Sequence, residues 1–291
     1  PNLIICCRKN SVFEYIKQNF HFQVYRFYVI LILRIYSLLM CFLKQEDSIM
    51  AKTAVITGAS AGIGKAIAHR LAGTYDHIAI TSYHHPEQLQ ATCDQLTSLG
   101  VTCIARTGDC GDYTFVQSFI AEVLASWGHI DTLVNNAGMS TIGLLTDLTP
   151  EGWNQILQTN LSSVFYYCHE VVPHMVHEHS GRILNISSVW GEVGASCEAA
   201  YSATKGGINA LTQALGKELA PSHIAVNAIS CGAVDTTMNA CFSDEERSSL
   251  EEAIPYGRMA ASEEVADFAL QILTSPAYLT GQIIRFDGGW I

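Results

Sequence analysis

Short apolar runs alternate with longer stretches typical of helices along residues 51–291. Apolar runs of this length, bounded by glycine and polar residues, are typical of buried strands. Their regular alternation with helical stretches predicts an α/β fold, a parallel sheet with helices on both faces. The expected strands are residues 53–57, 77–82, 101–106, 130–134, 182–186, 225–230 and 282–286.

Two further segments complete the expected architecture. Helices are expected at residues 65–73 and 262–274. Between residues 239 and 258 we expect a lid that closes over a ligand, in which Ser243 and Glu246 have the spacing of a capping box. An ordinary surface helix is the alternative.

The first 49 residues form a leader with a different pattern. Residues 27–43 are an apolar run of 17, short for a membrane span of roughly 20 residues. Arg34 at its middle would cost about 2.5–3.5 kcal/mol on insertion. No small-residue cleavage site follows, which disfavours a signal peptide. Because residues 44–47 can be encoded by a purine-rich, ribosome-binding type of sequence, we expect Met50 to be the start of a single domain at 50–291, preceded by translated upstream sequence or a weak membrane segment.

Composition narrows the classes of function. The net charge is −11, and the acidic excess lies in the body, which argues against nucleic acid and anionic membranes as partners. None of the ten cysteines forms a Cys-x-x-Cys pair, so a reducing cytoplasm is the simplest interpretation. The eleven histidines show no metal-ligand spacing, and no metal is predicted.

The stretch 188–205 has the pattern of an active site. Tyr201 and Lys205 are four residues apart, so on a helix they lie on the same face. A cation beside a phenol favours the phenolate, and we expect Lys205 to lower the pKa of Tyr201 from about 10. Ser188 ends a predicted strand, where its hydroxyl could bind a substrate oxygen.

A glycine-rich turn follows the first expected strand. Gly58, Gly62 and Gly64 allow a tight turn that opens a helix, and Ser60 and Ile63 lie between them. Free N–H groups at a helix N-terminus suit a pyrophosphate, so these five residues are expected to bind a dinucleotide. An ordinary strand-to-helix turn is the alternative.

The second strand ends where a dinucleotide fold recognises the adenosine ribose. An acid there selects NAD, whereas this chain has Tyr83 followed by two histidines. NADP(H) is therefore favoured, although Ala61 supplies no cation and NAD(H) stays possible. Asp109, after the third strand, could accept from the adenine amino group or cap the next helix, for which Asp112 is an equal candidate.

Two asparagine-containing segments follow. Asn136, Ala137 and Gly138 come directly after the fourth strand, where small residues let a ring or ribose approach the backbone. Asn160 lies within an expected helix, where asparagine is unfavourable, and it could be structural or functional.

Together these motifs resemble the classical short-chain dehydrogenase/reductase family over residues 52–290. The resemblance implies a doubly wound Rossmann domain with about seven strands, a nicotinamide cofactor and a catalytic tetrad. In it Ser188 orients a carbonyl, Tyr201 donates the proton, Lys205 binds the nicotinamide ribose and Asn160 holds a relay water. Tyr201, Lys205, Gly232, Val234 and Thr236 would also contact the cofactor. One departure is Cys231, at a position where the family has proline. Proline restricts the backbone, so cysteine in its place is expected to loosen the adjacent loop.

The resemblance implies a ketone substrate, small or carried on a protein, and two groups within the family suggest which. The chain resembles 3-oxoacyl-(acyl-carrier-protein) reductases, but acidic residues near the site suit an acidic carrier poorly. It also resembles reductases of a 5-aminopentanone group on elongation factor P, for which Trp190, Glu192 and Glu198 are candidate substrate residues. A small-molecule alcohol or steroid dehydrogenase and a non-catalytic nucleotide-binding scaffold are the alternatives. Relatives are commonly dimers or tetramers, so a homo-oligomer is expected, with residues 262–274 and 282–286 at its interface and with Trp290 and Ile291 buried there.

Overall fold

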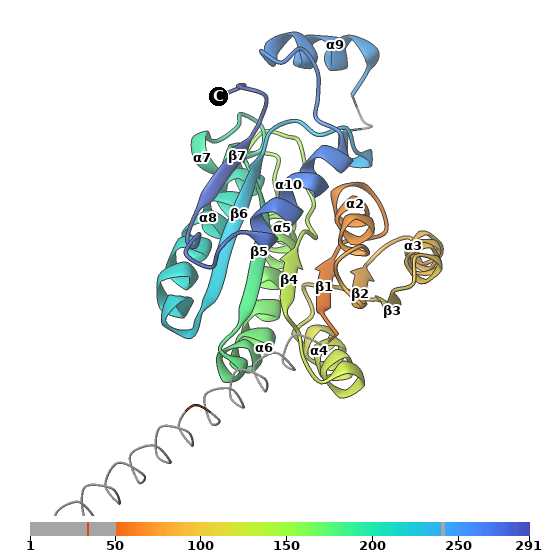
Figure 1. Cartoon of the computed structure of the whole chain (residues 1–291). Helices are drawn as coiled ribbons and strands as arrows, with labels where there is room; N and C mark the ends of the chain where they lie inside the picture. The colour runs from red at the N-terminus through yellow and green to blue at the C-terminus, as the bar shows by residue number, and fades with distance from the viewer. Residues whose placement is uncertain (1–33, 35–50, 240–241) are drawn as a thin grey trace, which may run out of the picture. The chain divides into compact units, whose positions relative to one another are not determined.

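The computed structural model describes residues 51–239 and 242–291, together with Arg34 by itself. The chain divides into two units, Pro1–Met50 and Ala51–Ile291. The second unit contains a seven-stranded sheet in the order β3-β2-β1-β4-β5-β6-β7 (Figure 1), and every neighbouring pair is parallel. The predicted α/β fold is confirmed. The strands are β1 (Thr53–Thr57), β2 (His77–Ser82), β3 (Thr102–Thr107), β4 (Thr132–Asn135), β5 (Gly181–Ser188), β6 (Ile224–Cys231) and β7 (Ile283–Phe286).

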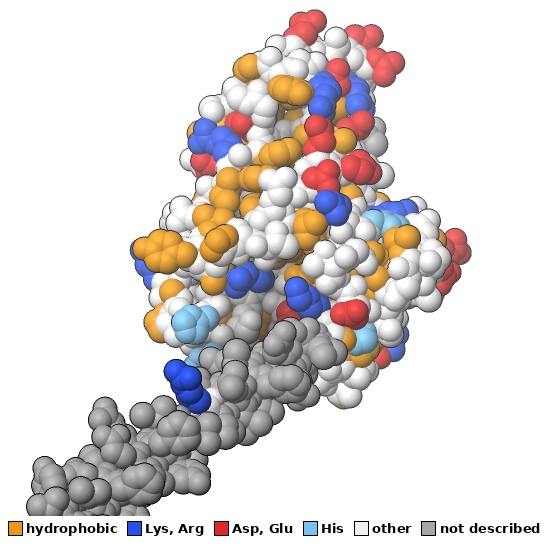
Figure 2. Space-filling view, viewed as in Figure 1, with side chains coloured by type: hydrophobic (Ala, Val, Ile, Leu, Met, Phe, Trp, Pro, Cys, Tyr) orange, Lys and Arg blue, Asp and Glu red, His pale blue; other side chains and the backbone are white. Residues whose placement is uncertain are grey.

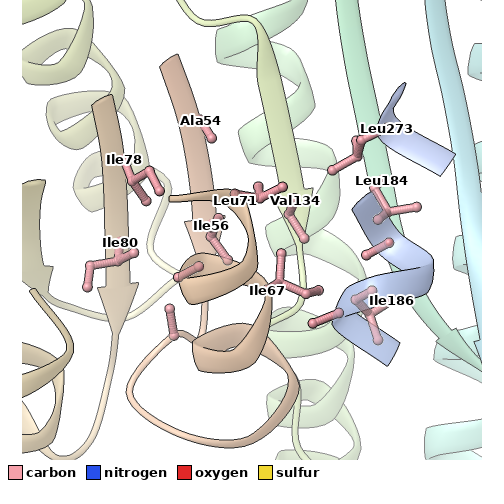
Figure 3. Packing of buried hydrophobic residues seen from close by; sticks show 14 of the residues in the cluster. Ala54, Ile56, Ile67, Leu71, Ile78, Ile80, Val134, Leu184, Ile186 and Leu273 are labelled. Carbon is pink, nitrogen blue, oxygen red and sulfur yellow. The ribbon is translucent and has the colours of Figure 1, made fainter. Parts of the chain in front are cut away.

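Two sets of helices cover the two faces of this sheet. The face that carries Ala54 and Ile56 of β1 packs against α2 (Gly62–Leu71), α3 (Pro86–Ser98) and α10 (Ser262–Thr274). Figure 3 shows this packing from close by. The face that carries Val55 packs against α4 (Tyr113–Trp127), α6 (Ser163–Glu178) and α8 (Ala199–Leu219). Because successive strand residues point to opposite faces, apolar residues at consecutive positions of β1 serve both layers.

The strand order reverses between β1 and β4. β1 pairs with β2 on one side and with β4 on the other. In open parallel sheets the connections leave such a point in opposite directions, and a crevice opens at the carboxyl ends of the strands. The short elements α5 (Pro150–Leu157), α7 (Trp190–Val193) and α9 (Asp244–Ala253) complete the helices named here, and α9 stands apart from those that cover the sheet (Figure 1).

Most predicted element boundaries agree with the structure to within about two residues. α10 has the predicted bounds, and α9 opens with the predicted capping box of Ser243 and Glu246. The first helix differs, because it begins at Gly62 and not at residue 65. Ala61 before it is extended, so the last part of the glycine turn, from Gly62 to Gly64, forms the first helical turn.

Among the described residues, no helix combines the length and the apolar character that crossing a bilayer requires. The apolar run at 27–43 lies outside the described residues apart from Arg34. The expected origin of the leader stays a prediction.

Candidate active site

A cavity of about 1220 Å³ lies at the carboxyl ends of the strands. It is lined by residues that follow β1, β2, β3, β4, β5 and β6, as expected for a crevice at the reversal of strand order. Such a volume exceeds that of a typical small-ligand pocket and can hold a dinucleotide with a substrate. The predicted residues that line it are Gly58, Ser60, Gly62, Ile63, Tyr83, Asp109, Asn136, Ala137, Gly138, Ser188, Trp190, Glu198, Tyr201, Lys205, Gly232, Val234 and Thr236.

The glycine turn is fixed by the segment that follows β4. The Asn136 side chain donates to the carbonyl oxygens of Thr57 and Gly58 at 2.9 and 3.0 Å. Thr57 Oγ1 accepts from the backbone N–H groups of Asn136 and Ala137. Asn136 therefore shapes the turn in addition to lining the cavity.

The glycines of the turn serve different purposes. Gly58 and Gly62 have positive φ angles of 67° and 54°, which L-residues adopt rarely. A Cβ on Gly64 would lie 2.4 Å from Gly58 O, so Gly64 permits the close approach of helix and turn. Gly62 and Ile63 bring the first turn of α2 to the cavity wall, where helix N–H groups lack intrahelical partners.

The far end of the cavity is built from the ends of β2 and β3. Tyr83, His84 and His85 line it and are exposed, and Ser82 Oγ donates to Ser60 Oγ at 3.0 Å. Asp109 also lines it while accepting from Gly111 N at 2.8 Å. The cap of α4 is Asp112, which accepts from Thr114 N, so that alternative for Asp109 is excluded.

These features fit a dinucleotide. A glycine turn and a helix N-terminus suit a pyrophosphate, and the neighbouring end of β2 has no carboxylate among Ser82–His85 that would repel a 2′-phosphate.

Tyr201, Lys205 and Ser188 meet at the opposite end of the cavity. Lys205 is buried, its Nζ donates to Ile186 O at 2.8 Å, and it lies 5.5 Å from the centre of the Tyr201 ring. Ser188 ends β5 as predicted, and its Oγ accepts from Trp190 N at 3.2 Å. The hydroxyl, the phenol and the ammonium group therefore line one wall.

The expected effect of Lys205 on Tyr201 is not found. Burial raises the pKa of Tyr201 above its usual value, and the Ser188 hydroxyl is the group that lowers it in part. Burial also lowers the pKa of Lys205 to about 8. The prediction of a depressed phenol pKa was wrong, because desolvation of the phenol outweighs the hydrogen bond to Ser188. Tyr201 is a neutral phenol at pH 7.

Asn160 lies in the wall behind this site. It is fully buried in a π-helical segment, Gln158–Ser162, between α5 and α6. Its side chain accepts from Met139 N and donates to Met139 O, both at 2.8 Å, and donates to Thr204 at 3.2 Å. Thus Asn160 joins the segment after β4 to α8. A π turn at such a position often marks a functional site, and nothing in the sequence pattern indicated it.

The three candidate substrate residues do not lie together. Trp190 and Glu198 line the cavity, and Glu198 accepts from Ser140 Oγ at 2.7 Å. Glu192 instead accepts from Ser230 and from Arg285, which holds its pKa below the usual range. Glu192 is not among the residues that line the cavity, and its contact with substrate stays a prediction. Sequence patterns also missed Ser140 and Trp290, which line the cavity from distant parts of the chain.

The segment that contains Cys231 is well anchored. Cys231 is buried at the end of β6, in register with Ser188, and its carbonyl accepts from Val189 N. Gly232 N donates to Phe286 O at 2.9 Å, and Asp235 N to Ala260 O at 2.8 Å. These bonds hold the loop that cysteine was expected to loosen.

Comparison with known proteins finds one matching family model and several similar oxidoreductases. Residues 52–247 match the family model described as short chain dehydrogenase. Over 243 residues, 83% of this chain and 99% of the relative, the chain is 36% identical to a Bacillus subtilis protein named as the uncharacterized oxidoreductase YmfI. It is 35% identical to the 3-oxoacyl-[acyl-carrier-protein] reductase FabG of Staphylococcus aureus, with 82% and 98% covered. The Escherichia coli protein of that name is also 35% identical, with 82% and 96% covered.

Proposed function

Because the chain belongs to the short-chain dehydrogenase family and is an oxidoreductase, we propose that it reduces a ketone to a secondary alcohol with a nicotinamide dinucleotide. The observation that carries this proposal is the meeting of Ser188, Tyr201 and Lys205 on one cavity wall. A hydroxyl, a phenol and an ammonium group at that wall provide a hydrogen-bond donor, a proton donor and a charge for a polarised carbonyl.

In the proposed mechanism each residue has a separate role. The neutral phenol of Tyr201 donates a proton to the carbonyl oxygen, and Ser188 orients that oxygen by a hydrogen bond. Lys205, cationic below its pKa of about 8, stabilises the phenolate that forms. Asn160 fixes the segment after β4 against α8. In the proposed mechanism it also holds a water molecule that relays the proton. When bound, the dinucleotide supplies the hydride.

We propose NADP(H) as the preferred cofactor. The pyrophosphate would lie against the glycine turn and the first turn of α2. Support for the 2′-phosphate comes from the end of β2, which presents Tyr83, His84 and His85 to the cavity in place of an acid. Asp109 and residues 136–138 would line the adenine and ribose, with Gly232, Val234 and Thr236 on the nicotinamide side.

For the substrate we propose a ketone that carries a cationic amine, such as a 5-aminopentanone group on elongation factor P. Glu198 supports this, as a carboxylate on the substrate side of the cavity. α9 adds five carboxylates against one arginine, and Figure 2 shows acidic side chains gathered at that end of the molecule. An acidic acyl carrier would be repelled there. A 3-oxoacyl thioester is the second candidate, since two relatives are named as reductases of that substrate.

The proposal extends to the setting of the enzyme. We propose a cytoplasmic homo-oligomer with α10 and β7 at an interface. The six described cysteines are free thiols, which suits a reducing compartment.

Steady-state reduction tests the proposal. NADPH and NADH are each supplied with an aminoketone and with an acetoacetyl thioester. We expect turnover with NADPH exceeding that with NADH, and a loss of about 10²–10⁴-fold in kcat for Tyr201→Phe with unchanged NADPH binding. Tyr113→Phe, which removes a half-buried phenol that donates to Glu170, is the matched control. Equal rates of wild type and Tyr201→Phe would overturn the mechanism, and thioester activity without aminoketone activity would overturn the substrate.

A further inference from the structure

The end of the chain contributes to the wall of the cavity. Trp290 lines the cavity together with Trp190, which follows Ser188 by two residues. The two rings are in edge contact, with centres 4.8 Å apart and planes at 60°. Edge-to-face packing of this kind gives a pair of aromatic rings a defined geometry. An aromatic wall thus stands next to the hydroxyl that is proposed to orient the carbonyl.

One ion pair holds the two parts of this wall. Arg285 in β7 donates to Glu192 in α7 at 2.6 and 3.4 Å, through two nitrogens. The same guanidinium donates to Ile291 O at 2.7 Å, and Ser230 donates to Glu192. Two-nitrogen contacts between arginine and a carboxylate fix orientation as well as distance. Arg285 therefore ties the residue after Trp290 to the helix that begins at Trp190.

The last five residues form a folded turn. Asp287 accepts from Gly289 N at 3.0 Å and from Ile291 N at 3.1 Å, and its carbonyl accepts from Trp290 N. Gly288 O accepts from Tyr256 N, which attaches the turn to the segment after α9. These contacts give Trp290 a defined position.

The ion pair of Arg285 with Glu192 is better suited to positioning the cavity tryptophans than to stabilising the fold. The side chains of Arg285 and Glu192 are 41% and 25% exposed, and partly exposed pairs add little to folding. Yet this pair joins the two elements that carry the cavity tryptophans. Residues fixed in this way can hold a substrate wall to the tolerance that catalysis needs.

We propose that residues 287–291 complete the substrate side of the site, with Trp290 a specificity-determining residue and Glu192 and Arg285 positioning residues for the tryptophan pair. This rests on the proposed function. It adds that the ketone places its hydrocarbon part against Trp190 and Trp290 while its oxygen meets Ser188 and Tyr201, and Glu198 of the same cavity is left for the proposed amine.

Three variants test this inference in the full chain. Trp290→Ala removes the ring, Trp290→Phe retains an aromatic ring, and Arg285→Gln breaks the ion pair. Arg70→Gln is the control, because it breaks an ion pair with Asp267 that joins α2 to α10 and is more exposed than the pair of Arg285 with Glu192. Each variant is assayed with butanone and with acetophenone, and its NADPH dissociation constant is measured by fluorescence.

We expect Trp290→Ala and Arg285→Gln to lower kcat/KM for acetophenone relative to butanone at least fivefold, mainly through KM. Trp290→Phe should recover most of the preference, and NADPH binding should change less than twofold in all variants. Arg285→Gln should also change the near-ultraviolet circular dichroism signal of the tryptophan pair. Arg70→Gln should leave that signal unchanged. A ketone ratio that stays within twofold in Trp290→Ala would overturn the proposal.

Ligand-detected NMR of acetophenone binding to the NADP⁺ complex separates this inference from the proposed function. If wild type turns over none of the ketones, the aminoketone included, but binds acetophenone, and Trp290→Ala binds it at least fivefold more weakly, the reductase proposal fails and the wall is upheld. If Trp290→Ala binds it as wild type does, or wild type does not bind it, the wall is overturned.

Discussion

Tyr201 and Lys205 lie one helical turn apart in α8, and burial acts on them in opposite directions. It raises the pKa of the phenol and lowers that of the ammonium group to about 8. In both cases desolvation disfavours the charged form. The pair is therefore poised with Tyr201 neutral and Lys205 charged below pH 8, the combination that a proton donor and its stabilising cation require.

Loss of the Lys205 charge should set the alkaline limb of the activity profile. Above its pKa of about 8 the ammonium group releases its proton and no longer stabilises a phenolate. We expect kcat/KM for ketone reduction at saturating NADPH to fall as pH rises through this value. Lys205→Arg should move the limb to higher pH, because a guanidinium keeps its charge.

Lys205→Met is a second test of whether Lys205 sets the alkaline limb, because methionine carries no charge. It should retain a small rate, at least 10²-fold reduced, with no limb between pH 7 and 9. An unchanged limb in either variant would assign it to another group. Rates are measured from pH 6 to 10 with NADPH binding checked at each pH.

At this scale the sequence predicted residue types better than residue contacts. Spacing predicted that Tyr201 and Lys205 share a helix face and that Ser188 ends a strand, because a four-residue interval and a strand end fix where side chains lie. Spacing could not separate Glu192 from Glu198. Arg285, the partner of Glu192, is 93 residues away in the chain, and only the order of β6 and β7 brings them together.

Elements contact one another closely where glycine leaves room. Gly216 in α8 faces the turn before β7, and a Cβ there would lie 2.5 Å from Gly281 Cα and N. The turn is fixed on both sides, since Thr280 Oγ1 accepts from Val226 N and Gly281 N donates to Val226 O. The backbone cannot move without breaking those bonds.

Gly216→Ala should therefore destabilise the fold. We expect the free energy of unfolding to fall by about 1–3 kcal/mol, although alanine favours a helix by up to about 1 kcal/mol. Gly73→Ala is the control, because a Cβ there has nothing within 4 Å and its φ is not positive. It should change stability by less than about 0.5 kcal/mol. Urea unfolding followed by circular dichroism measures both, and equal effects would contradict the packing argument.

Element order and type followed from the sequence, whereas local irregularities did not. Strands and helices alternate because each apolar run must be buried by an amphipathic partner, and that requirement is visible in the pattern. The π turn at Gln158–Ser162 has no such signal. It depends on Asn160 reaching Met139 and Thr204, contacts that exist only once α5, α6 and α8 are packed.

At the scale of the whole molecule, the two-faced core buries several weak acids. Burial raises the pKa of Cys110 to about 11 and those of Cys168 and Cys231 to about 12, above 9 for a free thiol. Burial likewise raises the pKa of Tyr167, so this phenol also stays protonated in the folded chain. The doubly wound fold was predictable, but which cysteines it buries depends on which helix covers which face.

These buried acids make the fold sensitive to alkali. A group whose pKa is raised on folding contributes stability fully below its unfolded pKa and loses that contribution as pH rises towards its folded pKa. For the three thiols the window runs from pH 9 to between 11 and 12. Lys205 has the opposite sign, because folding lowers its pKa from 10.5 to about 8, so it adds stability as pH rises between these two values. Burial raises the pKa of Cys103 and Tyr167 as well, so the groups that lose stability as pH rises above 9 outnumber Lys205.

We therefore expect the free energy of unfolding to decline between pH 9 and 11, by about 1.4 kcal/mol per pH unit for each proton retained on folding. Urea unfolding at fixed ionic strength over pH 7–11 measures the slope. Cys168→Ala removes one of the three protons and should make the decline shallower, whatever its effect on stability at pH 7. Cys197→Ala, at a thiol that is not fully buried, should leave the slope unchanged. A slope identical in wild type and Cys168→Ala would mean that groups other than the buried thiols control alkaline unfolding.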